Sequence, residues 1–284
     1  MSSFVIHTLA AEELLREIEN RYSIRLNDDD INKFLLGNLI VDSLKLDMTV
    51  PSNLEGQELI DYKMNLKRKN REEKVSTHFR NIHDEDNILK LPDPSKFISK
   101  YQILLSKDTS VLGYLFHLYT DRYFFSNLFP KTFISLKENG EIATKEKESH
   151  TIRILKSNKL VSDSIFWTGT SPLSIYSDYT LLNKLLLEHF GTSFNPEELL
   201  EFSKSNFKNP GIEEVDYNKI SEIITKTKRF IEESYTIPET ELNVFDEDTV
   251  KEFIHEVVAS FLKEYDYLLK PYISIKEIKL TKEN

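Results

Sequence analysis

The strongest chemical signal in the sequence is the motif His117-Leu-Tyr-Thr-Asp121, which lies in an apolar stretch. At a spacing of four, the imidazole and the carboxylate lie on the same face of a helix, one turn apart. An unpaired charge among apolar neighbours is costly, and a bound cation would satisfy both groups at once. The alternative is a buried hydrogen bond between the two side chains that only orders the core.

Two more polar residues stand in segments that are otherwise apolar and helical. His7 lies early in the first predicted helix, between Ile6 and Leu9. It is either a metal ligand or a core residue whose ring nitrogens are hydrogen-bonded. Asp42 follows the stretch Gly37-Asn38-Leu-Ile-Val, where a carboxylate is either a ligand or a helix-terminal cap.

Two histidines lie in or near a charged segment. His78 lies in the run Ser-Thr-His-Phe-Arg, at the point where the charged segment ends and regular structure is expected to resume. His83 and Asp84 form a literal His-Asp pair, the pattern of HD-type phosphohydrolases. That family places the pair in a helix with apolar neighbours, whereas the surroundings here, NIHDEDN, are polar. An exposed loop pair is therefore the preferred interpretation, and a group close to His78 is the alternative.

The order of these motifs along residues 4–130 carries a family resemblance. A histidine near the N-terminus, an aspartate after a Gly-Asn pair, a Thr-His-Phe and a helical HxxxD follow one another. In this respect the chain resembles the zinc-dependent phospholipase C superfamily, which includes the fungal single-strand-specific nucleases. It looks most like the small intracellular bacterial branch of that group.

The resemblance implies a metal centre. Asp42, His78, His117 and Asp121 would form one site. His7 would form a neighbouring site together with Asp121, which would bridge the two ions. Such an ion lowers the pKa of its bound water toward about 7 and polarises a phosphoryl oxygen. Asp42 would instead, or also, accept the proton of the attacking water as the catalytic base.

The ligands of the family's third ion have no counterpart in the chain. None of His150, His189 and His255 has an acidic residue four positions later. We therefore expect one or two divalent ions. Zinc is the ion that the resemblance implies, and sets of His and Asp ligands also accept manganese or iron.

The composition excludes several other classes of protein. The 284 residues include no cysteine, which excludes disulfide scaffolds, thiolate zinc fingers and iron–sulfur clusters. Lys and Arg total 37 against 47 Asp and Glu, and the net charge of -10 argues against general nucleic-acid binding. The sequence has no glycine-rich phosphate loop and no Gly-x-Ser-x-Gly elbow. The basic run at 67–71 is more typical of a solvated face than of a phosphate contact.

Helices must position these residues, because the chain has only 7 glycines and its apolar residues recur every three to four positions. Predicted helices cover residues 4–20, 31–44, 95–105, 111–129, 178–190, 196 onward, 217–235 and 246–269. Caps are expected at 28–30, Asp93, Asp108 and Asn195, and helix ends at Pro130 and Gly191. The charged run at 64–74 predicts an exposed loop, and residues 131–170 are mixed and partly β-prone (FISL, TIRIL).

These patterns predict an all-α fold, a multi-helix bundle that forms a single domain over residues 1–284. The metal-site core would span about 4–190 and a C-terminal helical extension about 195–284. We expect a metal-dependent hydrolase, a phospholipase C-like phosphodiesterase, whose substrate is a phosphoester small molecule or lipid headgroup. The alternative is a non-catalytic, metal-stabilised helical protein whose tail binds a partner. A cytoplasmic location is expected, because the first residues do not form a secretion signal and no stretch approaches the roughly 20 apolar residues of a transmembrane helix.

Overall fold

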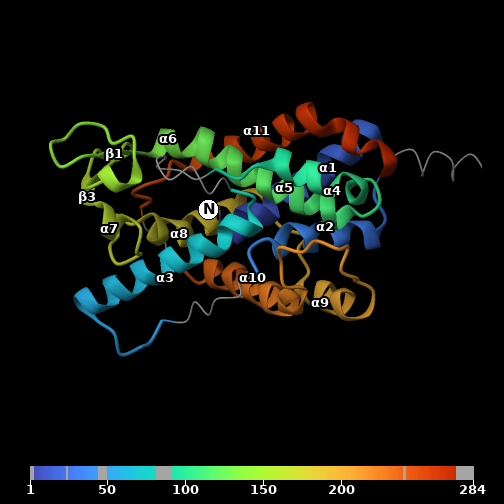
Figure 1. Cartoon of the computed structure of the whole chain (residues 1–284), viewed down its shortest axis with the longest axis horizontal. Coiled ribbons are helices and arrows are strands. Elements are labelled where there is room, and N and C mark those ends of the chain that lie inside the picture. Colours follow the sequence, from blue (N-terminus) through green and yellow to red (C-terminus); the bar gives the residue numbers. More distant parts are fainter. Residues whose placement is uncertain (1–2, 24, 44–49, 81–90, 239–240, 273–284) are drawn as a thin grey trace, which may run out of the picture.

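The chain is mostly helical, as predicted (Figure 1). The computed structural model describes residues 3–23, 25–43, 50–80, 91–238 and 241–272. None of the helices in these ranges is both long enough and apolar enough to cross a membrane. The helices are α1 (Phe4–Tyr22), α2 (Asp28–Ile40), α3 (Gly56–Thr77), α4 (Pro94–Leu105), α5 (Thr109–Tyr123), α6 (Phe129–Thr132), α7 (Asp163–Phe166), α8 (Ile175–Phe190), α9 (Pro196–Ser205), α10 (Ile220–Tyr235) and α11 (Glu247–Tyr265), with a π-helical turn η1 (Phe124–Leu128) and 3-10 turns η2 (Glu146–Glu148), η3 (Tyr217–Lys219) and η4 (Asp266–Leu268).

Polar side chains fix where most of these helices begin. Asn27 accepts a hydrogen bond from the Asp30 N–H at 2.8 Å, and the three aspartates that follow Asn27 lie in the first turn of α2. Negative charge is favourable there because it faces the positive end of the helix dipole. Asp108 and Asn195 cap α5 and α9 in the same way, and Gly191 ends α8, as predicted.

Helices α2 and α5 cross at two glycines. A Cβ atom at Gly37 would lie 1.8 Å from the backbone oxygen of Ser110, and one at Gly113 would lie 2.0 Å from that of Phe34. Only glycine allows two backbones to approach so closely. Because His117 stands one turn after Gly113, this crossing determines where its imidazole lies.

Helix α1 contacts five other helices, α2, α5, α8, α10 and α11. The last of these helices runs along α1 and α5, and the ring of Phe261 meets that of Phe116 with centroids 5.0 Å apart. The C-terminal part of the chain thus contributes to the same apolar core that surrounds the N-terminal helix.

The prediction of an exposed loop at 64–74 was wrong, because these residues lie within α3. Lys, Arg and Glu are good helix formers, so this segment forms a helix without an apolar stripe. The far part of α3 is tied to the turn after α7, where the Lys63 ammonium donates to the carbonyl of Thr168 at 3.2 Å, next to Trp167. In the last turn of α3, Lys74 and Thr77 are buried, and His78 is the C-cap of the helix.

Pro130 does not end the helix that contains the HxxxD motif. The chain continues through the π-helical turn into α6, and Pro130 takes up a first-turn position where no N–H is needed. A three-stranded antiparallel sheet follows, formed by β1 (Phe133–Leu136), β2 (Thr151–Ile154) and β3 (Leu160–Ser162). The segments FISL and TIRIL are its first two strands, so the fold is mostly helical rather than helical throughout.

Candidate metal centre

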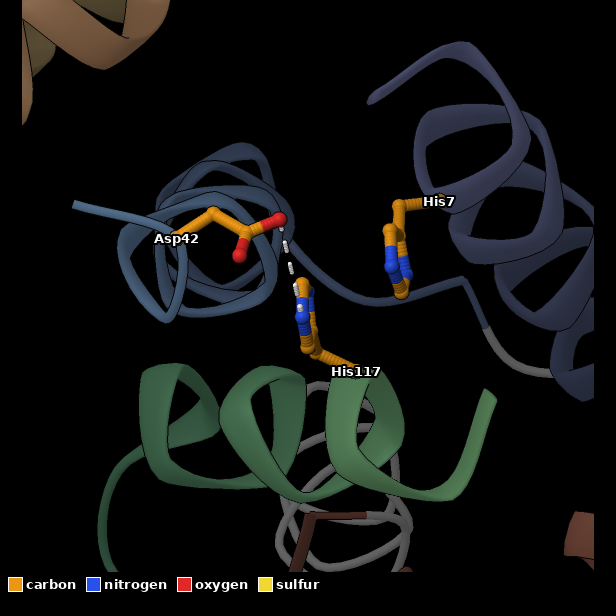
Figure 2. Close-up of side chains that lie close together, drawn as sticks. All are labelled: His7, Asp42 and His117. Carbon is orange, nitrogen blue, oxygen red and sulfur yellow. Dashed lines mark ion pairs between the residues drawn. The ribbon is translucent and has the colours of Figure 1, made fainter. Parts of the chain in front are cut away.

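The side chains that the sequence singled out as ligands lie together in the core. They come from the first turn of α1, the turn after α2, the C-cap of α3, and the middle and the last turn of α5: His7, Asp42, His78, His117 and Asp121. All of them are buried, with at most 9% of each residue's surface exposed. Figure 2 shows three of them, with His7 and His117 face to face and Asp42 beside His117.

Their ligand atoms are separated by distances that one ion can bridge. His7 Nε2 lies 3.3 Å from Asp121 Oδ1, and His78 Nε2 lies 3.3 Å from Asp121 Oδ2. Two atoms bound to one tetrahedral zinc ion at ~2.1 Å stand about 3.4 Å apart. Two sets of three residues offer ligand atoms within 4.8 Å of one another: His7, Asp42 and His117, and His78, His117 and Asp121. The two sets share His117, whereas the resemblance places Asp121 in the bridging position.

The imidazoles of His7 and His117 stack in parallel, with centroids 3.7 Å apart and planes 7° apart. Two protonated rings would repel each other strongly at this distance. Burial, together with the neighbouring His7, holds the pKa of His117 well below its ordinary value. The ring of His117 is therefore neutral at neutral pH.

The hydrogen bond at Nδ1 of His117 decides which nitrogen carries the proton. Nδ1 lies 2.8 Å from the backbone carbonyl of Asn38, and a carbonyl can only accept, so Nδ1 is the donor. The lone pair is then on Nε2, which has no hydrogen-bond partner in the part of the chain that the structure describes. A backbone carbonyl that accepts from the second nitrogen is common behind metal-bound histidines.

The two carboxylates are held in the ionised form. Burial alone would raise the pKa of Asp121, but the imidazoles of His7 and His78 help to hold it well below its ordinary value. Burial also opposes ionisation of Asp42, but the Lys74 ammonium and the imidazoles of His117 and His78 together hold its pKa far below the ordinary value. Ionised carboxylates and neutral imidazoles are the protonation states in which these groups bind cations.

Two buried basic residues belong to the cluster, and the sequence analysis missed both. The ammonium of Lys74 pairs with Asp42 Oδ1, and the guanidinium of Arg80 lies 5.8 Å above the ring of Phe125. Burial and the charges of Lys74 and Arg80 lower the pKa of His78 to about 4, against the effect of its contact with Asp121. Lys74 precedes His78 by four residues, the same spacing as the HxxxD motif, but it fell in the segment predicted to be a loop.

Hydrogen bonds from neighbouring residues hold the helices that carry the ligands. The side chain of Asn38 donates to the carbonyl of His7 at 3.0 Å, which ties α2 to the first turn of α1. The hydroxyl of Tyr114 donates to the carbonyl of Thr77 at 2.5 Å, and the Thr77 hydroxyl lies 2.8 Å from His78 Nδ1. The supports of the cluster are therefore themselves buried polar groups.

The other candidates lie apart from this cluster or outside the description. His83 and Asp84 lie outside the described residues. The basic run at 67–71 forms part of α3, where Arg68 and Lys69 are exposed, as expected for a solvated face.

The charges of the cluster determine what it can attract. The two carboxylates balance the ammonium of Lys74 and the guanidinium of Arg80, and the imidazole of His117 is neutral. A divalent cation would give the cluster an excess of two positive charges. Nitrogen and oxygen ligands of this kind fit zinc, manganese and iron, so the residues suit the ion that the resemblance implies.

Comparisons with protein-family models, with curated proteins and with solved structures find no match to this chain.

Proposed function

We propose that the chain is a metal-dependent hydrolase of phosphoesters, as its resemblance to the phospholipase C superfamily implies. One observation supports this most. The lone pair of His117 Nε2 lies in a buried site 4.0 Å from the ionised Asp42 Oδ2. Two acceptors that face each other without a proton between them repel, and a cation between them removes that repulsion.

His7, Asp42, His78, His117 and Asp121 would hold one or two ions. A divalent ion there supplies a Lewis acid for the phosphoryl group and a water that ionises near neutral pH. The buried side chains of these five residues would exclude bulk water from the ion and hold their nitrogen and oxygen lone pairs toward it. Because the pKa of Asp42 is so low, its carboxylate is a weak proton acceptor, which favours a role as ligand over a role as general base.

One feature favours the rival function, a non-catalytic helical protein. The Lys74 ammonium already pairs with Asp42, and the charges of the buried groups balance without an ion. Such a network would order the core as a set of satisfied ion pairs. Metal content separates such a metal-free network from the hydrolase. Hydrolysis separates the hydrolase from a non-catalytic protein that metal stabilises.

The test is the metal content of untagged protein, measured by elemental analysis for wild type and for the double variant His117→Ala/Asp121→Ala. We expect roughly one or two ions per wild-type chain and none in the variant, with the helical circular dichroism retained. Hydrolysis of a generic phosphoester should stop in His117→Ala. The matched control is His255→Ala, at an exposed histidine that meets Glu13 on the surface. Wild type without stoichiometric metal, even after reconstitution with zinc, manganese or iron, contradicts the proposal.

A further inference from the structure

The two sets of candidate ligands in the cluster share one nitrogen atom. His117 belongs to both sets, and the other members are His7 and Asp42 in one set and His78 and Asp121 in the other. Nδ1 of His117 donates to a backbone carbonyl, so Nε2 is its ligand atom. A neutral imidazole nitrogen offers a single lone pair and binds one ion. The two sets therefore cannot both be filled.

The orientation of the imidazole rings decides which set fits an ion. The lone pair of an imidazole nitrogen lies in the plane of its ring. The rings of His7 and His117 are parallel within 7°, with centroids 3.7 Å apart, so an ion bound to one nitrogen lies outside the plane of the other ring (Figure 2). The planes of His78 and His117 meet at 73°, with centroids 5.4 Å apart, and therefore intersect near both rings. His78 can share an ion with His117, whereas His7 cannot.

The surroundings of His78 also suit a ligand. Its Nδ1 lies 2.8 Å from the Thr77 hydroxyl, which can accept the ring proton, and its Nε2 lies 3.3 Å from Asp121 Oδ2. With the proton on Nδ1, the lone pair is on Nε2. One ligand atom each of His78, His117 and Asp121 lie within 4.8 Å of one another. Three protein ligands are the number found at catalytic zinc sites.

The ammonium of Lys74 already occupies one oxygen of Asp42. It pairs with Oδ1, and only 4% of Lys74 is exposed, so the pair lies inside the protein. The other oxygen, Oδ2, faces Nε2 of His117 at 4.0 Å. Asp42 thus has one oxygen left, and this oxygen is turned to the ion that His117 would bind.

The charge of the cluster favours a single ion as well. The carboxylates of Asp42 and Asp121 balance the ammonium of Lys74 and the guanidinium of Arg80, and all four residues are buried. One divalent cation gives an excess of two positive charges, and a second would raise it to four. Uncompensated charge away from water is costly. The ammonium thus supplies at Asp42 the positive charge that a second ion would bring.

We propose that the centre holds a single divalent ion and that the Lys74 ammonium takes the place of a second one at Asp42. The ion is bound by His78, His117 and Asp121. This arrangement differs from the two neighbouring ions that the resemblance implies. The presence of the ion rests on the proposed function, whereas the place of the ammonium at Asp42 does not.

His7 is then a positioning residue rather than a ligand. Its Nε2 lies 3.3 Å from Asp121 Oδ1, where it can donate to the carboxylate and orient it. Its ring also stacks on that of His117. His7 therefore acts on the ion through two ligands.

The first test counts the zinc bound per chain, by elemental analysis after dialysis against buffered zinc, with folding checked by circular dichroism. Wild type and Lys74→Arg should hold one ion, because both keep a cation at Asp42. Lys74→Met removes the charge, so a second ion at His7 and Asp42 is expected. The matched control is Lys63→Met, on the same helix, whose ammonium donates to Thr168; it should hold one ion.

Two ions in wild type overturn the single-ion centre. A single ion in Lys74→Met, as in wild type, overturns the role of the ammonium. Should Lys74→Met not fold, Lys74→Gln takes its place, because the amide is neutral and still donates to Asp42.

The second test compares the zinc dissociation constants of His78→Gln and His7→Gln, by competition with a chromophoric chelator. Both variants exchange an imidazole for an amide, which is not among the usual zinc ligands. His78→Gln should weaken binding at least about a hundredfold, and His7→Gln, which keeps a donor for Asp121, less than about tenfold. An equal or larger loss in His7→Gln overturns the assignment of the ligands.

Cobalt-substituted protein tests the positioning role of His7. His7→Ala removes the donor to Asp121 and should shift the absorption bands of the bound cobalt, and His7→Gln should restore them. Bands that stay unchanged in His7→Ala show that His7 does not position Asp121.

The two proposals fail in different ways. Two ions in wild type, with metal-dependent hydrolysis of a phosphoester, refute the single-ion centre and support the hydrolase. One ion in wild type without hydrolysis supports the single-ion centre and refutes the hydrolase. Wild type without metal refutes both, and in that case uptake of an ion by Lys74→Met alone shows that the ammonium takes the place of a cation.

Discussion

The two ring nitrogens of His117 have different neighbours, and this difference determines which nitrogen carries the proton. Nδ1 donates to the carbonyl of Asn38, so Nε2 faces the carboxylate of Asp42 with its lone pair. Asn38 therefore acts twice, because its backbone oxygen fixes the tautomer of His117 and its side chain donates to His7. A single buried residue thus binds the imidazole of His117 on α5 and the backbone of His7 on α1.

Asn38→Ala should separate these two roles. The backbone carbonyl that accepts from His117 stays, whereas the carbonyl of His7 loses a buried donor. We expect the free energy of unfolding to fall by about 1–3 kcal/mol, measured by urea denaturation of metal-free protein. Asn20→Ala, at an exposed amide on α1, is the control and should change it by less than about 0.5 kcal/mol. Equal stabilities of wild type and Asn38→Ala would show that the bond to His7 contributes nothing.

At the residue scale, the sequence indicates which groups can do chemistry but not which of them meet. His7 and His117 stand in apolar stretches, and burial of such residues follows from their neighbours. That their rings stack depends on how α1 lies across α5, which no local pattern encodes. The sequence analysis missed Lys74 because a lysine in a run of charges looks solvated until its helix is known to end in the core.

At the element scale, the crossing of α2 and α5 depends on Gly37 and Gly113. The atoms closest to a Cβ at either position belong to the other helix's backbone, which cannot rotate away as a side chain can. Any side chain there must separate the two helices. Separation would also break the hydrogen bond between Asn38 and His117.

Gly113→Ala should therefore destabilise the protein, although alanine is the better helix former. We expect a loss of about 1–3 kcal/mol or more in the free energy of unfolding, because the added methyl would overlap the carbonyl oxygen of Phe34. Thermal unfolding followed by circular dichroism measures the loss, and metal affinity should fall with it. Thr225→Ala, on an exposed position of α10, is the control for helix propensity. A melting temperature equal to or above that of wild type would contradict the close crossing.

The elements were predictable where side chains set their limits. Asp108 and Asn195 are caps that accept backbone N–H groups, so the starts of α5 and α9 could be located from the sequence. The cap of α2 was expected at 28–30 and is Asn27 instead, with the three aspartates in the first turn. Helix α3 could not, because its exposed part shows no apolar period and only its last turn enters the core. The strand-forming character of FISL and TIRIL was visible, but their pairing, with Ile134 opposite Arg153, depends on the long connection between them.

At the scale of the whole molecule, Glu12 joins the first helix to the connection between α8 and α9. Its Oε1 accepts hydrogen bonds from the Ser193 N–H at 2.8 Å, the Ser193 hydroxyl at 2.8 Å and the Thr192 hydroxyl at 3.1 Å. These hydrogen bonds lower the pKa of Glu12, but burial has the larger effect and raises the pKa above its ordinary value. The folded protein therefore binds this proton more tightly than the unfolded chain does.

The sign of the resulting pH dependence follows from linkage. The stabilisation by protonated Glu12 is fully present below the ordinary pKa of about 4.5 and is lost as the pH rises through the higher pKa of the folded state. Glu12→Gln keeps the accepting oxygen and does not titrate. We expect its free energy of unfolding, relative to wild type, to become more favourable as the pH rises from about 4 and then to level off.

Urea denaturation at steps between pH 4 and pH 7 measures this difference. Glu19→Gln, at an exposed position of the same helix, is the control and should show no such trend. A difference between Glu12→Gln and wild type that does not vary with pH, or that moves in the opposite direction, would contradict a raised pKa.

The contact between Glu12 and Ser193 illustrates why the assembly of the molecule could not be predicted. The two residues are far apart in the sequence, and neither stands in a pattern that indicates the other. The same holds for α11, whose apolar face is clear from its spacing but whose partners, α1 and α5, are not. The spacing of apolar residues predicts that one face of a helix is buried. Which element covers that face depends on the fold.

The tie between α3 and the turn after α7 gives the protein an intrinsic optical reporter. Trp167 is the single tryptophan of the chain and adjoins Thr168, whose carbonyl accepts from Lys63 of α3. The wavelength of indole fluorescence depends on the polarity around the ring. Because α3 also carries Lys74 and leads into His78, a shift of this helix during ligand uptake would change the emission of unlabelled, unmodified protein in real time.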